Sequence, residues 1–514
     1  MDILQQFIHY FPQALTASNL AVLVLGTIVG LVLGALPGLS PTMAVALLVP
    51  FTFVMEPSTG LTLLGSVYVC AMAGGAISAI LINVPGAPAN IATLFDGYPM
   101  SRQGKSQTAL NMCFISSLIG GLAGMAAMIF FTPYLANIAL KFGPSEMFWV
   151  AVVGVTCMAG LSTGSLVKGL FGGTFGLWLA TIGFSPMLGE PRFIFSDVLA
   201  GGINMVAALI GLFALPQMLT LMEGIYDQKK FTEKLKPEKG ILKQNILHVL
   251  KMRKTLSIGS IIGIIIGIIP GAGGQVAGLI AYDQTRRFSK DQTGFGKGDP
   301  RGVVAAETAN KAMAGPSLIP LLTLSIPGSP TAAVLLGGLL IHGIFPGPEL
   351  FQEHTDIVYI FMASLVLAQF SMTFFGILMA RYSYSIMNLP KRFIIAGVII
   401  LSVFGSYSIQ NNFNDIIICF GIGFVQYLFQ KAGITGGPVV LGLILGSIAE
   451  NNLSKAILIC NGTGESYFQY FGTGPINITL ILISVLSIAY SMYAGYRAAN
   501  PKQNGGEGTL CESN

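Results

Sequence analysis

The chain has 514 residues, of which 53% are hydrophobic and only 10% are charged, and its formal net charge is +5. Soluble domains carry about 25% charged residues, so this composition excludes a soluble globular protein. The basic residues lie in loops between long apolar stretches, where membrane topology explains them, and they indicate no nucleic-acid partner.

The sequence also lacks the patterns that would indicate an enzyme. Its six cysteines and four histidines are scattered, without the spacing of a disulfide framework or a metal site. No G-x-x-x-x-G-K-[ST] run is present to bind a nucleotide phosphate. We therefore expect no catalytic activity, no cofactor and no assigned metal ion.

In chain order, the first half opens with two interrupted apolar segments. Residues 20–55 are interrupted at Pro37-Gly38, and residues 61–95 are interrupted at Pro85-Gly86. Each uninterrupted stretch of about 20 residues is long enough to cross a bilayer. Further membrane spans are predicted at 107–131, 147–161, 169–189 and 198–222.

The second half repeats this order after a basic linker at 223–255. Residues 256–281 are interrupted at Pro270-Gly271, and a basic loop at 282–312 leads to residues 313–345, which are interrupted at Pro327-Gly328. The remaining spans are predicted at 357–380, 393–407, 414–430, 436–460 and 474–496, before a tail at 497–514.

The positions of Lys and Arg predict the topology. No basic residue precedes Arg102, which places the N-terminus in the periplasm. Segment 256–281 has basic loops on both sides, so we interpret it as a re-entrant hairpin that enters from the cytoplasm. Segment 20–55 is then the mirror hairpin from outside. If every other segment crosses once, the C-terminus and all Lys and Arg except Lys141, Arg192 and Lys455 are cytoplasmic.

The two hairpins share the rare spacing G-x3-G-x3-G-x2-P-G. An odd number of crossings separates them, so the second half begins from the opposite side of the membrane. We predict an all-α polytopic membrane protein with inverted repeats at 1–222 and 256–460, each with a hairpin and a broken helix, as in an elevator-like secondary transporter. The motif residues are Gly26, Gly30, Gly34, Pro37 and Gly38, and Gly259, Gly263, Gly267, Pro270 and Gly271.

These motifs have a structural and a functional interpretation. Glycine at every fourth position is typical of close helix packing, which we accept for the glycine stripes. A single Pro-Gly is often a kink, but four breaks matched pairwise indicate more. Freed backbone groups at membrane depth must be buried in protein or line a cavity, and paired interruptions are the best sequence indication of a midplane site.

The breaks therefore predict a binding site. Restarting helices present unpaired N–H groups and positive dipole ends, which suit an anion. No Lys or Arg lies within these hairpins or broken segments as bounded above, so we expect small polar groups and backbone to bind a carboxylate between the two hairpin tips. Na⁺ is a candidate near Asn83 and Ser325. The candidate residues are Pro37, Gly38, Ser40, Thr42, Asn83, Pro85, Gly86, Asn90, Pro270, Gly271, Gly273, Gly274, Gln275, Ser325, Pro327, Gly328, Ser329 and Thr331.

The sequence leaves open what the polar residues at the tips do. Each polar residue at a tip could cap a broken helix instead of touching a ligand. The tip glycines Gly38 and Gly271 are expected to allow a close backbone approach that a side chain would block.

Long stretches of the chain resemble the large permease subunit of tripartite tricarboxylate transporters, the TctA family. The resemblance implies the membrane-spanning part of a secondary transporter in the bacterial inner membrane. It also implies two partners, a small four-helix membrane subunit and a periplasmic solute-binding protein, with a citrate-like substrate and a Na⁺ or H⁺ gradient as the driving force. The matching stretches are GALPGLSPTMAVALLVPFTF (34–53), ILINVPGAPANIATLFDGYPM (80–100), IIPGAGGQVAGLIAYDQTRRF (268–288), GVVAAETANKAMAGPSLIPLLTLSIPGSPTAAVLLGGLLIHGIFPGPELF (302–351) and GPVVLGLILGSIAENNL (437–453).

Other transporters stay open as alternatives. An ion-coupled carrier for another organic anion or an amino acid could work without a binding protein. An anion channel could also use broken helices, although matched inverted halves favour alternating access.

Overall fold

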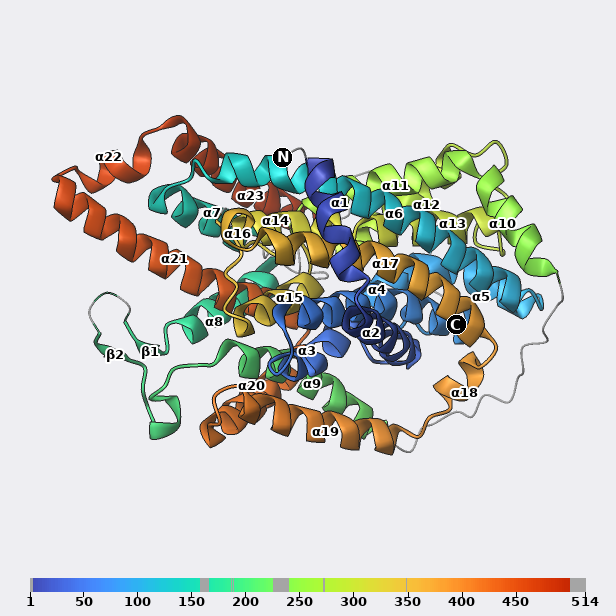
Figure 1. Cartoon of the computed structure of the whole chain (residues 1–514), viewed down its shortest axis with the longest axis horizontal. Helices are drawn as coiled ribbons and strands as arrows, with labels where there is room; N and C mark the ends of the chain where they lie inside the picture. Colours follow the sequence, from blue (N-terminus) through green and yellow to red (C-terminus); the bar gives the residue numbers. More distant parts are fainter. Residues whose placement is uncertain are drawn as a thin grey trace.

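The computed structural model describes residues 3–157, 166–185, 187, 189–224, 240–270, 273–347 and 349–499. Almost all of the described elements are helices (Figure 1). Those of the first half are α1 (Ile3–Ala14), α2 (Ala17–Ala35), α3 (Pro41–Thr52), α4 (Pro57–Ile82), η1 (Pro88–Asn90), α5 (Ile91–Arg102), α6 (Ser106–Ala139), α7 (Pro144–Cys157), α8 (Leu166–Ala180), η3 (Asp197–Leu199) and α9 (Met205–Glu223).

The helices of the second half follow α10 (Ile241–Lys251), which lies in the linker between the halves. They are α11 (Arg253–Ile268), α12 (Gly273–Arg287), α13 (Pro300–Ala312), η4 (Pro316–Leu318), α14 (Ile319–Leu324), α15 (Pro330–Ile341), α16 (Leu350–Glu353), α17 (Thr355–Ala380), α18 (Ser383–Met387), α19 (Lys391–Ser408), α20 (Phe413–Lys431), α21 (Gly436–Thr463), α22 (Tyr467–Gly472) and α23 (Pro475–Ala499).

Eight helices of the described chain are long and apolar enough to cross a membrane. This confirms the prediction of an all-α polytopic membrane protein. Besides helices, the described chain contains a small hairpin of two antiparallel strands, β1 (Gly183–Phe184) and β2 (Pro191–Arg192). The eight helices are α2, α4, α6, α9, α17, α19, α20 and α21.

Several predicted boundaries differ from the structure, and three of the differences have a clear local cause. The span expected at 169–189 ends at Ala180, because Gly183 adopts a φ of +123° and begins the strand pair. The span expected at 198–222 begins at Met205, where the Asn204 side chain accepts hydrogen bonds from the first helical N–H groups. The third difference concerns the expected loop at 282–312.

Most of that expected loop is helical. α12 continues to Arg287, and α13 begins at Pro300, where the Asp299 carboxylate accepts a hydrogen bond from the Arg301 N–H. Proline at the first helical position after an Asp cap is a common helix start. The second broken segment therefore begins near 300 rather than at 313. Every residue of α13 from Gly302 to Ala312 is buried.

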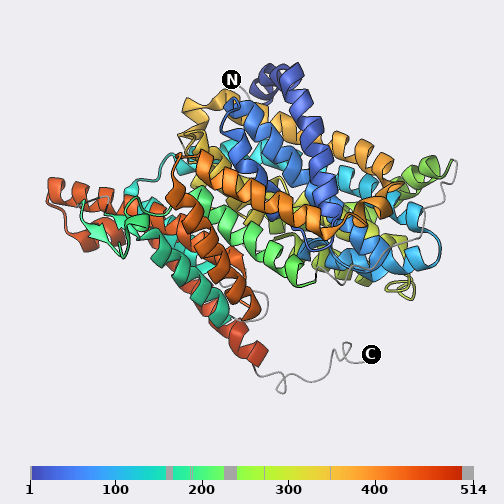
Figure 2. The same cartoon turned by 90° about the horizontal axis from the view of Figure 1, so that it is seen from below.

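Two helices, α4 and α13, form the centre of the bundle. The apolar window of α4 is 94% buried, which leaves almost no surface for lipid. α2 packs along α4 and α11 packs along α13, while α17 lies against α2 and α4, and α6 lies against α11, α13 and α4. A limb formed by α7, α8, α21 and α23 projects from this bundle (Figure 2).

The glycine stripes make the same contacts in both halves. Gly26 and Gly30 of α2 approach Leu63 and Val67 of α4. Gly259 and Gly263 of α11 approach Ala305 and Ala309 of α13, which occupy the corresponding positions in the second half. The last glycine of each stripe, Gly34 or Gly267, meets Ala71 or Met313. Close helix packing is therefore the structural role of both stripes.

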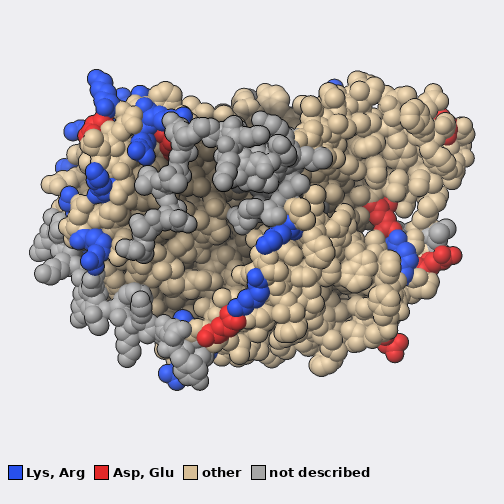
Figure 3. All heavy atoms as spheres, turned by 180° about the vertical axis from the view of Figure 1, so that it is seen from behind, with Lys and Arg blue, Asp and Glu red and all other residues tan. Residues whose placement is uncertain are grey.

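Many Lys and Arg residues gather at one end of the bundle, where α5, α10 and α12 lie in Figure 1 (Figure 3). Lys254, at the start of α11, donates to the carbonyl of Phe288, just after α12, over 2.8 Å. Gln103, after α5, donates to the carbonyl of Lys297 over 2.8 Å. The two ends of the α11–α12 pair thus lie together, as a hairpin requires; its re-entry into the membrane stays a prediction.

Cysteine labelling tests the orientation of this basic end. Single cysteines at Lys251 and Lys297, in a cysteine-free background, should both resist a membrane-impermeant maleimide in intact cells, because basic loops remain in the cytoplasm. A cysteine at Glu56, between α3 and α4, should label as the outward control. Labelling at only one of the two lysine positions would contradict the hairpin topology.

Candidate functional site

Three of the four Pro-Gly pairs lie between two described helices. Pro37-Gly38 separates α2 from α3, and Pro85-Gly86 separates α4 from η1. Pro270 follows α11, and Pro327-Gly328 separates α14 from α15. Gly271 lies outside the described residues. For convenience we call the α2–α3 connection (36–40) tip 1, the α11–α12 connection (269–272) tip 2, and the segments 83–87 and 325–329 break 1 and break 2.

The two breaks have the same backbone geometry. Asn83 and Ser325 each end a helix with a left-handed conformation, at φ values of +60° and +61°. Three residues later, the N–H of Gly86 donates to the carbonyl of Gly75, and that of Gly328 donates to the carbonyl of Ser317, both over 3.2 Å. The freed backbone groups are thus partly satisfied by carbonyls of α4 and η4, which come before the breaks in the chain.

Glycine is required at these positions because backbone lies too close for a side chain. A Cβ on Gly86 would lie 2.5 Å from Gly75 Cα and 2.7 Å from the Gly34 carbonyl oxygen. A Cβ on Gly328 would lie 2.8 Å from the Ser317 carbonyl oxygen and 3.1 Å from that of Gly267. Each break therefore fits against the last glycine of its own stripe.

At Gly38, by contrast, no other part of the protein backbone lies close. A Cβ there would meet only the Leu221 side chain, at 3.4 Å. The constraint at Gly38 is its φ of +88°, which disfavours any residue with a side chain. The close approach of a ligand to the backbone at Gly38 stays a prediction.

The hairpins contact the breaks in a crossed arrangement. α3, which follows tip 1, packs on α15, which follows break 2, and the hydroxyl oxygens of Thr42 and Thr331 lie 2.9 Å apart. α12, which follows tip 2, packs on η1 and α5, which follow break 1. Gly274 and Gly278 of α12 face Ala89 there. The structure thus brings each hairpin to the break of the opposite half.

Several predicted site residues have capping roles. Ser40 Oγ accepts from the N–H of Met43 at the start of α3, and it also accepts from the Gln217 side chain over 2.8 Å. Ser329 Oγ accepts from the N–H of Ala332 at the start of α15. Ser325 Oγ donates to the carbonyl of Pro346 over 2.7 Å. These contacts fix the shape of tip 1 and of break 2.

The predicted residues occupy two regions. Those brought together around tip 1 and break 2 are Pro37, Gly38, Ser40, Thr42, Ser325, Pro327, Gly328, Ser329 and Thr331. Those around tip 2 and break 1 are Asn83, Pro85, Gly86, Asn90, Pro270, Gly273, Gly274 and Gln275.

A buried carboxylate that sequence reasoning missed lies beside break 1. Glu307 of α13 is fully buried. Its Oε1 accepts from the Thr93 hydroxyl over 2.5 Å and from the Asn90 amide over 3.3 Å, and its Oε2 accepts from the Ser117 hydroxyl over 3.3 Å. These donors come from η1, α5 and α6, so Glu307 links three elements of the first half to the second.

A buried lysine lies one turn further along α13. The Lys311 side chain is fully buried, and its ammonium donates to the carbonyl of Val69 on α4. None of the ion pairs among the described residues, at a limit of 4.0 Å, joins Lys311 to Glu307. A carboxyl group and an amino group are thus held separately inside the bundle. Ionisable residues at membrane depth are costly, and by default they indicate function.

Lys311 corrects one expectation from sequence. We expected no basic residue in the broken segments, because the helix that holds Lys311 was assigned to a loop. A signal was available, since Glu307 and Lys311 lie four residues apart in a run otherwise rich in Ala and Val, after an Asp-Pro helix start. In the described chain, the side-chain amide of Asn310, beside Lys311, and Asn90 Oδ1 are buried without a hydrogen-bond partner.

A second buried carboxylate fixes the start of α13. Asp96 of α5 accepts from the N–H groups of Gly298 and Asp299, over 2.9 and 2.8 Å, and from the Tyr282 hydroxyl over 2.9 Å. Asp96 therefore joins α5 and α12 to α13. Because fixed donors already bind both of its oxygens, we assign the Asp96 carboxylate a structural role.

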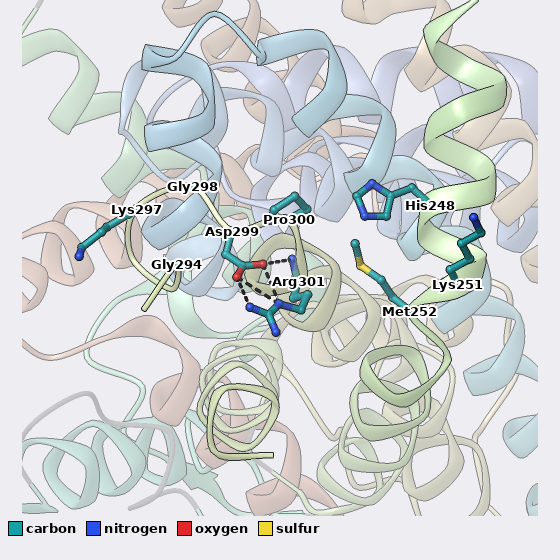
Figure 4. A pocket seen from close by; sticks show the side chains of 9 residues that line it. All are labelled: His248, Lys251, Met252, Gly294, Lys297, Gly298, Asp299, Pro300 and Arg301. Carbon is teal, nitrogen blue, oxygen red and sulfur yellow. Dashed lines mark hydrogen bonds and ion pairs between the residues drawn. The ribbon is translucent and has the colours of Figure 1, made fainter. Parts of the chain in front are cut away.

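A surface pocket at the basic end is a weaker candidate for the substrate site (Figure 4). It lies between the end of α10 and the loop that precedes α13, away from the four breaks. Its Arg301 guanidinium is already held by the Asp299 carboxylate at 2.5 Å, while Lys297 points away from the centre of the pocket. The pocket is lined by His248, Lys251, Met252, Gly294, Lys297, Gly298, Asp299, Pro300 and Arg301.

Comparisons with known proteins identify similar chains. The sequence signature described as the tripartite tricarboxylate transporter TctA family matches residues 20–441. An uncharacterized 52.8 kDa protein in the TAR-I ttuC' 3'region of Agrobacterium vitis is 30% identical over 508 residues, which cover 98% of this chain and 99% of that protein. An uncharacterized protein in the TAR-II ttuC' 3'region of the same organism is 28% identical over 236 residues, or 46% of this chain and 96% of that protein. No solved structure matches the chain.

Alanine substitution tests the backbone geometry of the breaks. Gly86→Ala and Gly328→Ala should each destabilise the protein by about 1–3 kcal/mol, because the new Cβ overlaps backbone that cannot move freely. The measurement is the melting temperature of the purified protein in detergent. Gly397→Ala is the matched control, since a Cβ there meets nothing within 4 Å. Equal melting temperatures for all three variants would show that the breaks are loosely packed.

Proposed function

The chain belongs to the tripartite tricarboxylate transporter TctA family and is a membrane component of a transporter, and on this premise we propose that it is the permease subunit of a binding-protein-dependent secondary transporter. In this proposal it imports tricarboxylates such as citrate, or related organic acids. A Na⁺ or H⁺ gradient drives the import, and the partners are a small four-helix membrane subunit and a periplasmic solute-binding protein.

The observation that carries this proposal is the crossed pairing of hairpins and breaks. Three features recur at corresponding positions of the two halves. They are the left-handed residue that ends the helix before each break, the hydrogen bond from the N–H of the glycine in each break, and the contacts of the glycine stripes. Such correspondence supports two repeats, which we propose to be inverted and to work by an elevator-like motion. Substrate sites of such carriers lie near the midplane, where broken helices of the two repeats meet.

The difference in exposure between the breaks also supports alternating access. Break 1 is open, with Val84 41% exposed, whereas Ile326 of break 2 is 4% exposed and packs against Val150 and Leu445 of the limb. Equivalent elements of an inverted-repeat carrier should differ in this way in any one state, because only one side has access to the site.

The chemistry of this region suits a carboxylate substrate. The starts of α3, α12 and α15 present helix N-termini, which favour anions. Small polar residues stand beside them, and Lys311 adds a positive charge within the bundle. Na⁺ near Asn83 and Ser325 remains our proposal for an ion site at the ends of the preceding helices. We also propose the inner membrane as its location, with the N-terminus periplasmic and the C-terminus cytoplasmic.

Reconstituted uptake tests the proposal. Proteoliposomes that contain the permease and the small subunit, supplied with the binding protein, should accumulate labelled citrate, malate or tartrate when a Na⁺ or H⁺ gradient is imposed. Because no phosphate-binding loop is present in the sequence, ATP should have no direct effect.

The controls of the same assay separate the alternatives. Liposomes without the binding protein should show little uptake, and full uptake without it would favour a self-sufficient carrier. Downhill flux that no gradient can turn into accumulation would favour a channel. Accumulation that needs ATP and ignores both gradients would contradict the proposal.

A further inference from the structure

We propose that Glu307 carries the coupling proton of transport and that Lys311 is the fixed counter-charge that links this proton to the anionic substrate. The inference rests on the proposed function, which leaves the choice between Na⁺ and H⁺ open. It is carried by the geometry around α13, where the two charged groups are buried and separately held.

The surroundings of Glu307 suit a group that gains and loses a proton. Its partners are two hydroxyls, of Thr93 and Ser117, and the amide of Asn90. A hydroxyl can donate or accept, and an amide offers both functions. These partners can therefore satisfy the carboxylate and also the protonated acid, in contrast to a fixed arginine or lysine. The Oδ1 of Asn90, which has no partner among the described residues, is an acceptor available to the protonated form.

The same contacts favour a proton over Na⁺ at Glu307. Three donors already point at its two oxygens, whereas a bound cation needs oxygen lone pairs directed at it. Glu307, Asn90 and Thr93 are all 0% exposed. A proton adds almost no volume to such a tightly packed environment.

Charge balance provides the coupling. With Glu307 ionised and Lys311 charged, the pair is neutral, and an entering carboxylate would bring an uncompensated negative charge. When a proton from the aqueous phase binds a Glu307 oxygen, –COO⁻ becomes –COOH, a neighbouring hydroxyl turns to accept, and Lys311 is left with the net charge of the pair. At about 10 Å, one charge favours an anion by roughly 1–2 kcal/mol at an effective dielectric constant of 20. Because coupling between two bound ligands is reciprocal, the bound anion favours proton binding by the same free energy. The proton and the anion then leave together on the other side of the membrane.

Few other titratable groups face this pair. Cys113 of α6 lies near Glu307 and Lys311, and Cys70 of α4 lies near Lys311. Asp96 of α5 and Tyr282 of α12 are bonded to each other at the start of α13. Asp96 is held by two fixed N–H donors and a tyrosine hydroxyl, whereas the side-chain partners of Glu307 suit both of its protonation states.

The test uses the reconstituted permease with its two partners and the first of citrate, malate and tartrate that the wild-type protein transports. Glu307→Gln mimics the protonated acid. It should retain exchange of labelled for unlabelled substrate but lose the roughly tenfold accumulation that one coupled proton sustains per unit of pH gradient. Asp283→Asn, which removes an exposed carboxylate on α12, is the matched control and should accumulate substrate normally.

A second variant keeps the test decisive if Glu307→Gln does not fold. Thr93→Val removes a donor to the ionised carboxylate, which favours the protonated form. The midpoint of the pH profile of uptake should therefore move to higher pH, by about one to two units. A merely structural role would lower the rate without moving the midpoint.

Two results would overturn this inference and leave the proposed function intact. One is pH-driven accumulation by Glu307→Gln at the wild-type ratio, and the other is wild-type accumulation that follows a Na⁺ gradient and ignores pH. Failure of the wild-type protein to transport any of the three acids would instead overturn the proposed function, and this inference with it.

Discussion

The structure depends on one constraint, which is that a helix broken at membrane depth must satisfy the backbone groups that it frees. Both breaks meet it in the same way. A left-handed residue, Asn83 or Ser325, turns the chain, and the glycine three residues later bonds back to a helical carbonyl before the break, in α4 or in η4. This return is possible only because neither Gly86 nor Gly328 has a side chain. The glycine stripe of each hairpin then ends beside the break, so stripe and break form one packing unit.

The arrangement of the candidate site follows from these two packing units. The second arm of each hairpin packs both on its own half and on the opposite half, where α3 contacts α15 and α12 contacts η1 and α5. The tips are therefore connected through the breaks, and a ligand at one region is linked mechanically to the other half. Glu307 extends the same connection, because its three partners belong to the first half while it belongs to the second.

The sequence was sufficient for the helices and the four interruptions, since hydropathy and Pro-Gly pairs are local signals. It was insufficient for α13, because Glu307 and Lys311 lower the mean hydropathy of a helix that is in fact buried. Their burial depends on partners from α4, α5 and α6, which no local pattern encodes. Likewise, the expectation that the two tips share one site did not anticipate the crossed packing of α3 and α12.

The central claim is that the crossed contacts are the moving contacts of transport, and a reversible cross-link tests it most directly. The hydroxyls of Thr42 and Thr331 lie 2.9 Å apart, so cysteines at both positions in a cysteine-free background are close enough to form a disulfide. Oxidation of the double variant should stop uptake, and reduction should restore it, while each single variant remains active in both conditions. If the cross-linked protein transports at the rate of the reduced protein, α3 and α15 do not need to separate, and the account is contradicted.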